Sequence, residues 1–484
     1  MRKSTTKLLM ALLVAAFSAL SVEAASTVKP KKGMNLVGVV TDGTEPMAGV
    51  VVSDGVNVVM TDAKGEYQMH TDSARFVFVS LPSYCKIPMK DGYPCIYQEI
   101  ALDGKKSVQR DFVLERQPID QRFLLVTMAD VQIQNTRDLG MLQTDVMDDF
   151  TYAVNALGGT VIGLTLGDNV WDNMPFYEKF MDVFRKLDIP VFPVIGNHDH
   201  DLRTPVDYMA DHAFKDNFGP TYYSFNRGDV HIIAMDDINY SGRKNYTEEF
   251  SKEQIEWLKK DLEFVPEDKF IVIGFHAPTT HYGGKPRVLN AQEFYDVLAG
   301  RKVQLLAGHL HSNHHTVIND NIQEHSVAAF MGAFWNGDLC PDGSPRGFGV
   351  YQFDGNKLVD SYYQGHCHPR SYQMYVYRPG QAIEDKYKDG IIANVFNAGS
   401  NWTVEINEDD AGWKPMEKFK GIDPRAYFHL YGKHKPAYRG YAEPRVNNPH
   451  LYYYKPASES WNKAQVRATD PHGNVYTETV TNNR

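Results

Sequence analysis

The chain has 484 residues, of which 43% are hydrophobic and 23% are charged, and its formal net charge is -10. This composition excludes a disordered or fibrous protein, and the length suits two or three domains with a large buried core. The acidic balance argues against general binding to duplex nucleic acid or to an anionic membrane. A phosphate ligand would therefore have to be attracted by a local site.

Residues 1–25 have the features of a secretory signal peptide. Arg2, Lys3 and Lys7 form a basic head, an apolar run covers residues 8–22, and small residues up to Ala25 offer a cleavage site. An apolar run of about 15 residues is shorter than the roughly 20 that span a bilayer, so a membrane anchor is the weaker interpretation. We expect cleavage, export to the periplasm, cell surface or medium, and no transmembrane segment in the mature protein.

Residues 33–116 have the pattern of a small antiparallel β-sandwich, of the immunoglobulin or transthyretin type. In NLVGVVTDGTEPMAGVVVSDGVNVVMTDAKGEYQMH, short β-branched runs alternate with Asp-Gly, Glu-Pro and Lys-Gly turns. The segment resembles the transthyretin-like or carboxypeptidase-regulatory module found ahead of many exported enzymes, which implies a folding or spacing role. Cys85 and Cys95 flank a loop and could form a disulfide after export, while Cys340 and Cys367 could pair or stay free.

Residues 120–368 are predicted to form a layered α/β domain. Short, nearly continuous apolar runs suit strands covered on both faces: FLLVTM, TVIGLTL, VFPVI, VHIIAM, FIVIGF and VQLLA. A helix is predicted over residues 251–264, where Ser251 and Gln254 have the spacing of a capping box. Ligand sites in open α/β sheets gather at the carboxyl ends of strands, so the polar residues that follow these runs are expected to converge. They are Asp130, Asp168, Asn197, His198, Asp199, Asp236, His276 and His309.

Residues 372–484 are rich in Tyr, Trp and Pro, and we predict a second all-β module there. The segment WNKAQVRATDPHGNVYTETV near its end is typical of two strands joined by an Asp-Pro-His-Gly turn. This module is also a candidate wall of the ligand cleft.

Five segments of the central domain carry the chemistry: MADVQ (128–132), LGDNVWD (166–172), GNHDH (196–200), GFHAP (274–278) and AGHLHS (307–312). In this order they resemble the signature D-x-H, G-D, G-N-H-D/E, H and G-H-x-H of the calcineurin-like metallophosphoesterases, with four of the five blocks intact. The resemblance covers residues 123–365. The flanking sequences 219–236 and 335–355 resemble exported bacterial members that carry both β-modules, which extends the resemblance over the mature chain.

The resemblance implies a layered α/β fold and hydrolysis of phosphoesters by water activated on two divalent metal ions. It also implies the metal ligands, with Asp168 bridging both ions. His198 is expected to donate a proton to the leaving group, and Asp199 to hold its imidazole. The implied ligands are Asp130, Gln132, Asp168 and His311 for one ion, and Asp168, Asn197, His276 and His309 for the other.

Gln132 departs from the family pattern, which usually has His at this position. An amide oxygen is a weaker ligand than imidazole but is competent for a hard cation. Gln at this position also resembles branches that act on nucleotide diphosphate derivatives or phosphoproteins. We therefore expect a retuned site, in which Mn²⁺ or Mg²⁺ is favoured over Zn²⁺ and Fe²⁺ is also admissible.

The substrate is expected to be a phosphorylated small molecule, nucleotide, lipid or glycan, and both monoesters and diesters stay open. His200 is the last residue of the GNHDH segment and lies beyond the family block G-N-H-D/E, either as a loop residue or a support behind the ligands, or as a substrate contact. His281, Tyr282, Phe334 and Trp335 lie in loops near the predicted rim, where they either stack on a leaving group or pack.

An alternative hypothesis is a surface or periplasmic binding protein that uses its β-modules, with a central domain whose catalysis is weakened by Gln132. The intact second metal site and His198 argue against it. The sequence also lacks the G-x-S-x-G elbow of serine hydrolases and the glycine-rich loops of nucleotide-driven enzymes and dehydrogenases.

Overall fold

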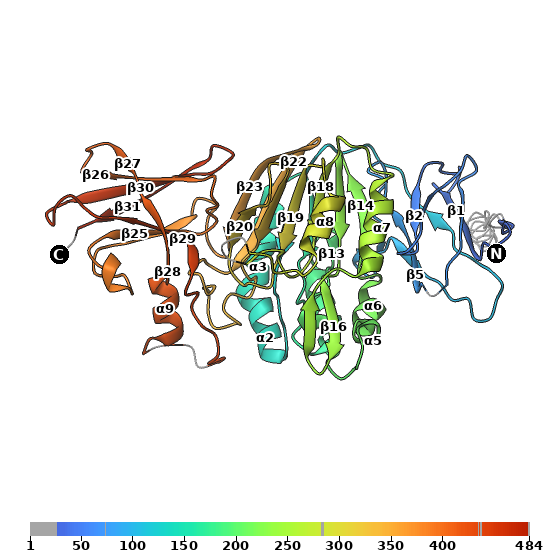
Figure 1. The fold of residues 1–484 in the computed structure, drawn as a ribbon, viewed down its shortest axis with the longest axis horizontal. Coiled ribbons are helices and arrows are strands. Elements are labelled where there is room, and N and C mark those ends of the chain that lie inside the picture. Colours follow the sequence, from blue (N-terminus) through green and yellow to red (C-terminus); the bar gives the residue numbers. More distant parts are fainter. Residues whose placement is uncertain (1–26, 73, 282–284, 434, 436–437, 483–484) are drawn as a thin grey trace, which may run out of the picture.

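Three parts of the chain follow one another in a row. The structure, a computed structural model, describes residues 27–72, 74–281, 285–433, 435 and 438–482, so the predicted signal peptide lies outside the described residues. The N-terminal module lies at one end of the molecule, the mixed α/β part in the middle and the C-terminal module at the other end (Figure 1). Within the described residues, no helix combines the length and apolar character needed to cross a bilayer.

The N-terminal module is a β-sandwich, as the alternating pattern predicted. One sheet has the order β10–β1–β4, with β9 also paired to β1, and the other has the order β3–β2–β5–β8. The strands are β1 (Leu36–Thr41), β2 (Val51–Ser53), β3 (Val58–Met60), β4 (Glu66–Met69), β5 (Phe76–Ser80), β8 (Tyr97–Glu99), β9 (Val108–Gln109) and β10 (Phe112–Val113), with a hairpin of β6 (Met89–Lys90) and β7 (Tyr93–Pro94). The four cysteines of the chain are free thiols in this structure, so Cys85 and Cys95 are not bridged.

The central part is built on two sheets. The first pairs β13 (Val191–Phe192), β12 (Thr160–Thr165), β11 (Arg122–Met128), β22 (Gly347–Asp354) and β23 (Lys357–Gly365) in that order. The second pairs β14 (Tyr223–Arg227), β15 (Val230–Ala234), β18 (Phe270–Gly274), β19 (Val303–Ala307), β21 (Ile322–Ser326) and β20 (His314–Val317). The neighbours β11, β12 and β13 are parallel, and so are β15, β18, β19 and β21. Their carboxyl ends bring the motif loops together.

Helices connect these strands. They are α2 (Thr136–Met141), which continues through a π-helical turn (Leu142–Val146) into α3 (Met147–Leu157), then α4 (Tyr177–Phe184), α5 (Asp207–Ala210), α6 (His212–Phe218), α7 (Lys252–Leu262) and α8 (Ala291–Val297). The hairpin of β16 (Ile238–Gly242) and β17 (Asn245–Glu248) precedes α7. The hydroxyl of Ser251 accepts from the Gln254 amide at 3.2 Å, as the capping pattern predicted. The Gln254 side chain instead bonds to the backbone of Asp236.

The C-terminal module has two sheets, ordered β24–β25–β29–β28 and β27–β26–β30–β31. Its strands are β24 (Met374–Tyr377), β25 (Ile391–Val395), β26 (Thr403–Glu408), β27 (Trp413–Pro415), β28 (Glu417–Gly421), β29 (Asn448–Tyr454), β30 (Lys463–Thr469) and β31 (Val475–Thr481). The last two form the predicted hairpin. The module also contains a helix, α9 (Pro424–Tyr431), so it is not purely β. Asp423 caps this helix and Pro424 occupies its first turn, a start signal hidden in a β-rich sequence.

The two outer modules are joined to the centre in different ways. The N-terminal module shares one continuous apolar core with the central sheets, whereas the C-terminal module has two main apolar cores of its own. Its junction with the centre combines a small apolar cluster of Ala333, Leu430 and Ala442 with buried polar contacts. The carbonyl of Asp342 accepts from the side chains of Asn394 (2.8 Å) and Asn448 (2.6 Å), and the Asp342 carboxylate lies 3.1 Å from Nε2 of His450.

Candidate metal centre

The residues expected to bind metal all follow central strands. Asp130 and Gln132 follow β11, Asp168 follows β12 and Asn197 follows β13, so these four belong to the first sheet. The histidines come from the second sheet, with His276 after β18 and both His309 and His311 after β19. The site therefore forms where the carboxyl ends of the two sheets meet.

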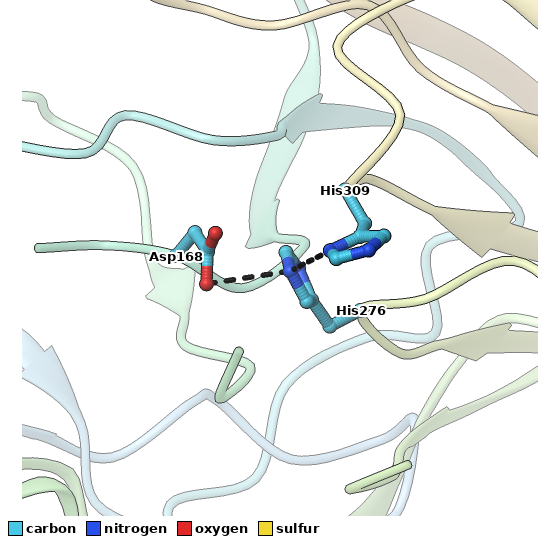
Figure 2. A group of neighbouring side chains, drawn as sticks. All are labelled: Asp168, His276 and His309. Atoms are coloured by element: carbon cyan, nitrogen blue, oxygen red, sulfur yellow. Dashed lines mark hydrogen bonds and ion pairs between the residues drawn. The ribbon is translucent and has the colours of Figure 1, made fainter. Parts of the chain in front are cut away.

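Two groups of side chains in this region have the spacing of metal ligands. One contains Asp168, His276 and His309, and the other contains Asp130, Asp168 and His311. Within each group, the possible ligand atoms lie within 4.8 Å of one another. Figure 2 shows the first group, whose side chains point toward one another from three separate loops. Because Asp168 belongs to both groups, it stands where a bridging ligand is expected.

His276 is fixed in an orientation that suits a ligand. Its Nδ1 lies 2.8 Å from the carbonyl oxygen of Leu166, which requires a proton on Nδ1, so the neutral form that binds a metal carries its lone pair on Nε2. This Nε2 lies 3.3 Å from Oδ1 of Asp168, 3.1 Å from Nδ1 of His309 and 2.9 Å from Oδ1 of Asn197 (Figure 2 shows the first two). Asn197 therefore joins this group, as expected from the motif.

The second group contains oxygen atoms that lack a hydrogen-bond donor. Oδ1 of Asp130 lies 3.1 Å from Nε2 of His311, while Oδ2 accepts from the His309 amide at 2.9 Å. The Gln132 side chain donates to Oδ2 of Asp168 at 2.6 Å. Oδ1 of Asp130 and Oε1 of Gln132 are buried without a hydrogen bond. Buried acceptors without partners are unfavourable, and a cation at this position would satisfy both.

The backbone at the candidate ligands is strained. Asp130, Gln132, Asp168, His309 and His311 all have positive φ, between 45° and 64°. Non-glycine residues rarely adopt this conformation, and it persists only where the surroundings impose it. In two of the loops, this conformation occurs at ligands two residues apart, Asp130 with Gln132 and His309 with His311.

Glycines next to these ligands allow the loops to approach closely. A Cβ atom on Gly196 would lie 2.4 Å from Oδ1 of Asp168, and one on Gly308 would lie 2.8 Å from Oδ2 of Asp130. These distances are too short for any larger residue. The Gly in each of the GNH and GHLH motifs is therefore required by packing around the carboxylates.

His198 lies beside the candidate ligands but is held by a different residue than predicted. Its Nδ1 lies 2.7 Å from Oδ1 of Asp172, and its backbone amide donates to Oδ1 of Asp168 at 2.9 Å. Burial lowers the pKa of His198, but the Asp168 carboxylate and the Asp172 hydrogen bond outweigh it, so the pKa is raised above its usual value. The prediction that Asp199 holds this imidazole is wrong.

Asp199 instead ties two motif loops together. Its carboxylate accepts from the backbone amides of Gly196, Asn169 and Val170 and from the hydroxyl of Tyr177, at 2.9 to 3.2 Å. Three of these donors are backbone amides, and together with the Tyr177 hydroxyl they hold the carboxylate away from the imidazole. Burial and the nearby Asp168 charge raise its pKa to about 7, against the effect of the amide donors.

Two predicted substrate contacts are buried supports. His200 is fully buried and its Nδ1 lies 2.9 Å from the carbonyl oxygen of Gly196. Trp335 is also buried, and its indole N–H donates to the carbonyl oxygen of Val131 at 3.1 Å, within the loop that carries two candidate ligands. Neither side chain is open to a substrate, so the predicted substrate contacts of both are wrong, and the alternatives, support for His200 and packing for Trp335, are confirmed. Both side chains are buried because their ring nitrogens satisfy backbone carbonyl groups that would otherwise lack a hydrogen-bond partner.

The other predicted contacts have separate outcomes. His281 is exposed on the loop after His276, and its role in substrate binding stays a prediction. Tyr282 lies outside the described residues. Phe334 is half-buried and its ring lies 4.6 Å from that of His311, beside the metal centre.

Glu248, at the end of β17, also contacts the candidate ligands but was not predicted from the sequence. Its Oε1 lies 3.4 Å from Nε2 of His309 and 2.5 Å from a guanidinium nitrogen of Arg287. Despite partial burial, these contacts lower the pKa of Glu248 to about 2, so it stays ionised. A carboxylate behind a metal-binding imidazole orients the ring. Nothing in the sequence marks Glu248, whereas Asp172 lies in the LGDNVWD motif and could have been considered.

The C-terminal module also contributes to the site through residues 438–445. Arg439 forms a buried ion pair with Asp138 of α2, at 2.7 Å, and the Tyr438 hydroxyl donates to the same carboxylate at 2.5 Å. Arg445 donates to the carbonyl oxygen of Leu310 at 2.5 Å. Leu310 lies between the candidate ligands His309 and His311. The C-terminal module therefore contacts the loops around the candidate ligands, and its role as a wall of a ligand cleft stays a prediction.

Comparison with known proteins agrees with the motifs. Family models match the N-terminal region of calcineurin-like phosphoesterases at residues 34–117, the calcineurin-like phosphoesterase itself at 129–313, and the C-terminal region at 324–476. No curated protein matches the chain. A dimetal phosphatase from Danio rerio is among the similar solved structures, with 15% identity and a TM-score of 0.37, over 51% of this chain and 100% of that one.

Two nucleotidases are also similar. A 5'-nucleotidase from Candida albicans has 13% identity and a TM-score of 0.34, over 51% of this chain and 52% of that one. A 5'-nucleotidase precursor from Thermus thermophilus has 13% identity and a TM-score of 0.31, over 50% and 54%. The chain spans about half the length of both. With family models matched from residue 34 to residue 476, the protein belongs to the calcineurin-like phosphoesterase family.

Proposed function

We propose that this protein is an exported phosphoesterase that hydrolyses phosphate monoesters or diesters with two divalent metal ions. The observation that carries the proposal is the pair of ligand groups that share Asp168. Two further observations support it: the buried oxygens of Asp130 and Gln132 that lack a donor, and the strained backbone at the candidate ligands.

The donor set fits two cations. When bound, they would supply a water acidic enough to act as the nucleophile at neutral pH and a counter-charge for the phosphoryl oxygens. Only Asp130 and Asp168 are anionic, so the occupied site would carry a net charge of about +2, which attracts phosphate to an acidic protein. Asp130, Gln132, Asp168 and His311 would hold one cation, and Asp168, Asn197, His276 and His309 the other.

His198 is the proposed proton donor to the leaving group. The Asp172 carboxylate engages Nδ1, so Nε2 is the nitrogen that can give a proton to the departing oxygen. The raised pKa keeps the ring protonated over a wider pH range than a free imidazole. His198→Ala should therefore reduce kcat for alkyl phosphates far more than for nitrophenyl phosphates, whose leaving groups need little protonation. Equal losses on both substrates would contradict this role.

Gln132 is proposed to shift the metal preference toward Mn²⁺ or Mg²⁺ and away from Zn²⁺, because it replaces an imidazole with an amide oxygen. Gln132→His should restore an imidazole and increase affinity for Zn²⁺ relative to Mn²⁺, measured by competition titration. Wild-type protein that is purified with two tightly held Zn²⁺ ions would contradict the proposal.

The central test combines metal analysis with two assays. The metal content of the mature protein is measured by elemental analysis, and hydrolysis of nitrophenyl phosphate and bis-nitrophenyl phosphate is followed with and without added Mn²⁺. Turnover that requires about two metal ions per chain supports the proposal, and the ratio of the two rates separates monoesterase from diesterase. One metal or none, without turnover under any condition, contradicts it and favours a binding role for the β-modules.

Export is proposed from the leader sequence in residues 1–25. The full chain is expressed in a bacterium with two membranes, and the N-terminus of the product is determined by mass spectrometry. A periplasmic or extracellular product that begins near Ser26 is expected. An intact Met1 on a cytosolic product would contradict export.

A further inference from the structure

We propose that Trp171, Phe334 and Tyr441 form a leaving-group subsite that selects phosphoesters of ring-bearing alcohols. These three residues are called the aromatic shelf below. The inference rests on the proposed function, because it assigns the part of the substrate that departs when the phosphoester is cleaved.

The aromatic shelf is continuous and lies against the centre on two sides. The centroid of the Trp171 ring is 5.2 Å from that of Phe334 and 5.7 Å from that of Tyr441, and the last two are 5.3 Å apart. Trp171 also lies 5.0 Å from His198, and Phe334 lies 4.6 Å from His311. The shelf thus touches both the proposed proton donor and a candidate metal ligand.

The contact between Trp171 and His198 places the leaving group next to the aromatic shelf. The departing oxygen accepts a proton from His198, so the carbon attached to that oxygen must lie within a few ångströms of the imidazole. Trp171 borders the imidazole, and its neighbour in sequence, Asp172, holds it. The same short loop therefore positions the proton donor and offers a flat apolar surface to the group that leaves.

The aromatic shelf is less enclosed than an ordinary core cluster. The Tyr441 side chain is 56% exposed, and Trp171 and Phe334 are only half-buried. Phe334 has a positive φ of 55°, a strained conformation for an aromatic residue. Strain and exposure at adjacent aromatic residues are unfavourable for folding alone and are typical of binding surfaces.

The position of Tyr441 is set by rigid contacts behind it. Arg439, two residues earlier, pairs with buried Asp138 at 2.7 Å, and its guanidinium lies 4.6 Å from the Trp171 ring. Its backbone amide donates to Asn336 at 2.9 Å. Because the Arg439 charge is neutralised by Asp138, the shelf offers rings rather than charge.

This chemistry selects a class of leaving group. Aromatic faces bind other aromatic rings by offset or edge-to-face stacking, and they also cover the apolar face of a sugar ring. A short alkyl group or the side chain of a phosphoserine offers no flat surface of this kind. The aromatic shelf therefore favours a leaving group that contains a ring. The experiment below distinguishes an aromatic ring from a sugar ring.

The test compares Tyr441→Ala with wild-type protein, both loaded with Mn²⁺, on benzyl phosphate, glucose 6-phosphate and ethyl phosphate. All three are esters of primary alcohols, so they make similar demands on the proton donor. If the enzyme proves to be a diesterase, the corresponding methyl diesters are used. Tyr441→Phe keeps the ring, and Tyr152→Ala removes an exposed tyrosine from α3 as a matched control.

We expect Tyr441→Ala to lower kcat/KM for a ring-bearing ester by about three- to tenfold, the range of one aromatic contact. Ethyl phosphate should change by less than about twofold, and Tyr441→Phe and Tyr152→Ala should behave as wild type. Whether benzyl phosphate or glucose 6-phosphate is more affected identifies the kind of ring. Equal losses on all three esters, or none, would overturn the aromatic shelf while leaving the phosphoesterase intact. A wild-type protein inactive on every ester would instead contradict the proposed function.

Discussion

The two β-modules have similar sequence textures but different relations to the metal centre. The N-terminal module shares the apolar core of the central sheets, and its polar contacts include Ser53 with Trp257 of α7 and the Gly55 carbonyl with Tyr222. The C-terminal module has its own cores, yet its residues Arg439 and Arg445 contact the loops of the site. The shared apolar core of the N-terminal module thus provides support, whereas the junction of the C-terminal module provides residues that contact the loops of the site. The two ends of Figure 1 differ in role although both are β-rich.

The largest effect is expected for substitutions in the candidate metal centre, with which the effects of both β-modules are compared. Asp168→Asn keeps the shape of the side chain but removes the charge shared by both ligand groups, so activity should fall by at least about a thousandfold. Elemental analysis should also find less than the wild-type metal content. Asp236→Asn is the matched control, because burial already raises the pKa of Asp236 well above its usual value and favours its neutral form. Similar activity in both variants would remove Asp168 from the site.

The next largest effect tests whether Asp172 or Asp199 supports His198 in the central domain. Asp172→Asn removes the charge that holds His198 and lowers the pKa of the ring, so kcat for alkyl phosphates should fall by about 10- to 100-fold. Nitrophenyl phosphates should lose much less. Asp199→Asn should instead destabilise the fold, because five donors surround its carboxylate. If Asp199→Asn alone showed the leaving-group dependence, the original assignment of Asp199 would be restored.

A third substitution tests the C-terminal module. Arg445→Ala removes the donor to the Leu310 carbonyl between two candidate ligands, and the dissociation constant for Mn²⁺ should rise by about tenfold. The measurement is calorimetric titration of chelator-treated protein. Arg467→Ala, which breaks an ion pair with Glu405 between β26 and β30, is the control in the same module. Equal metal affinities in the two variants would reduce the C-terminal module to a support like the N-terminal one.

The smallest catalytic effect is expected in the N-terminal module. Ser53→Ala leaves the buried indole N–H of Trp257 without its acceptor, which should lower the free energy of unfolding by about 1 to 2 kcal/mol. Metal affinity and kcat/KM should not change. Urea unfolding and the nitrophenyl assay measure the two quantities. A loss of activity in folded protein would show that this module also acts on the site, and the contrast between the modules would fail.

Much of the central fold follows from local sequence. The apolar runs became strands because both faces of each sheet are covered, and the polar residues after them converge because parallel strands end at one edge. The run VFPVI gave only the two-residue β13, since Pro193 has no amide to continue the ladder. The candidate ligands could be named because their spacing in the motifs is unusual.

The predictions for individual residues that were wrong depended on contacts that the local sequence does not specify. Asp199 is adjacent to His198 in sequence, but neighbours in a tight turn point in different directions, so Asp172 of another loop reaches the imidazole. Trp335 was judged by residue type, and only packing shows that its N–H serves a buried carbonyl. Tyr441 could not be found, because its partners lie far away in the chain and no local pattern marks them.

The ion pair between Arg439 and Asp138 joins positions 301 residues apart in the chain. At a synthesis rate of about 5 to 20 residues per second, roughly 15 to 60 seconds pass between the two residues leaving the ribosome. By the end of that interval every candidate ligand has been made, the last of them His311, whereas the loop that carries Tyr441 is only then being completed. The nascent protein can thus assemble its catalytic machinery before it acquires the surface that we propose selects among esters. Substrate discrimination would be the last property of the molecule to mature.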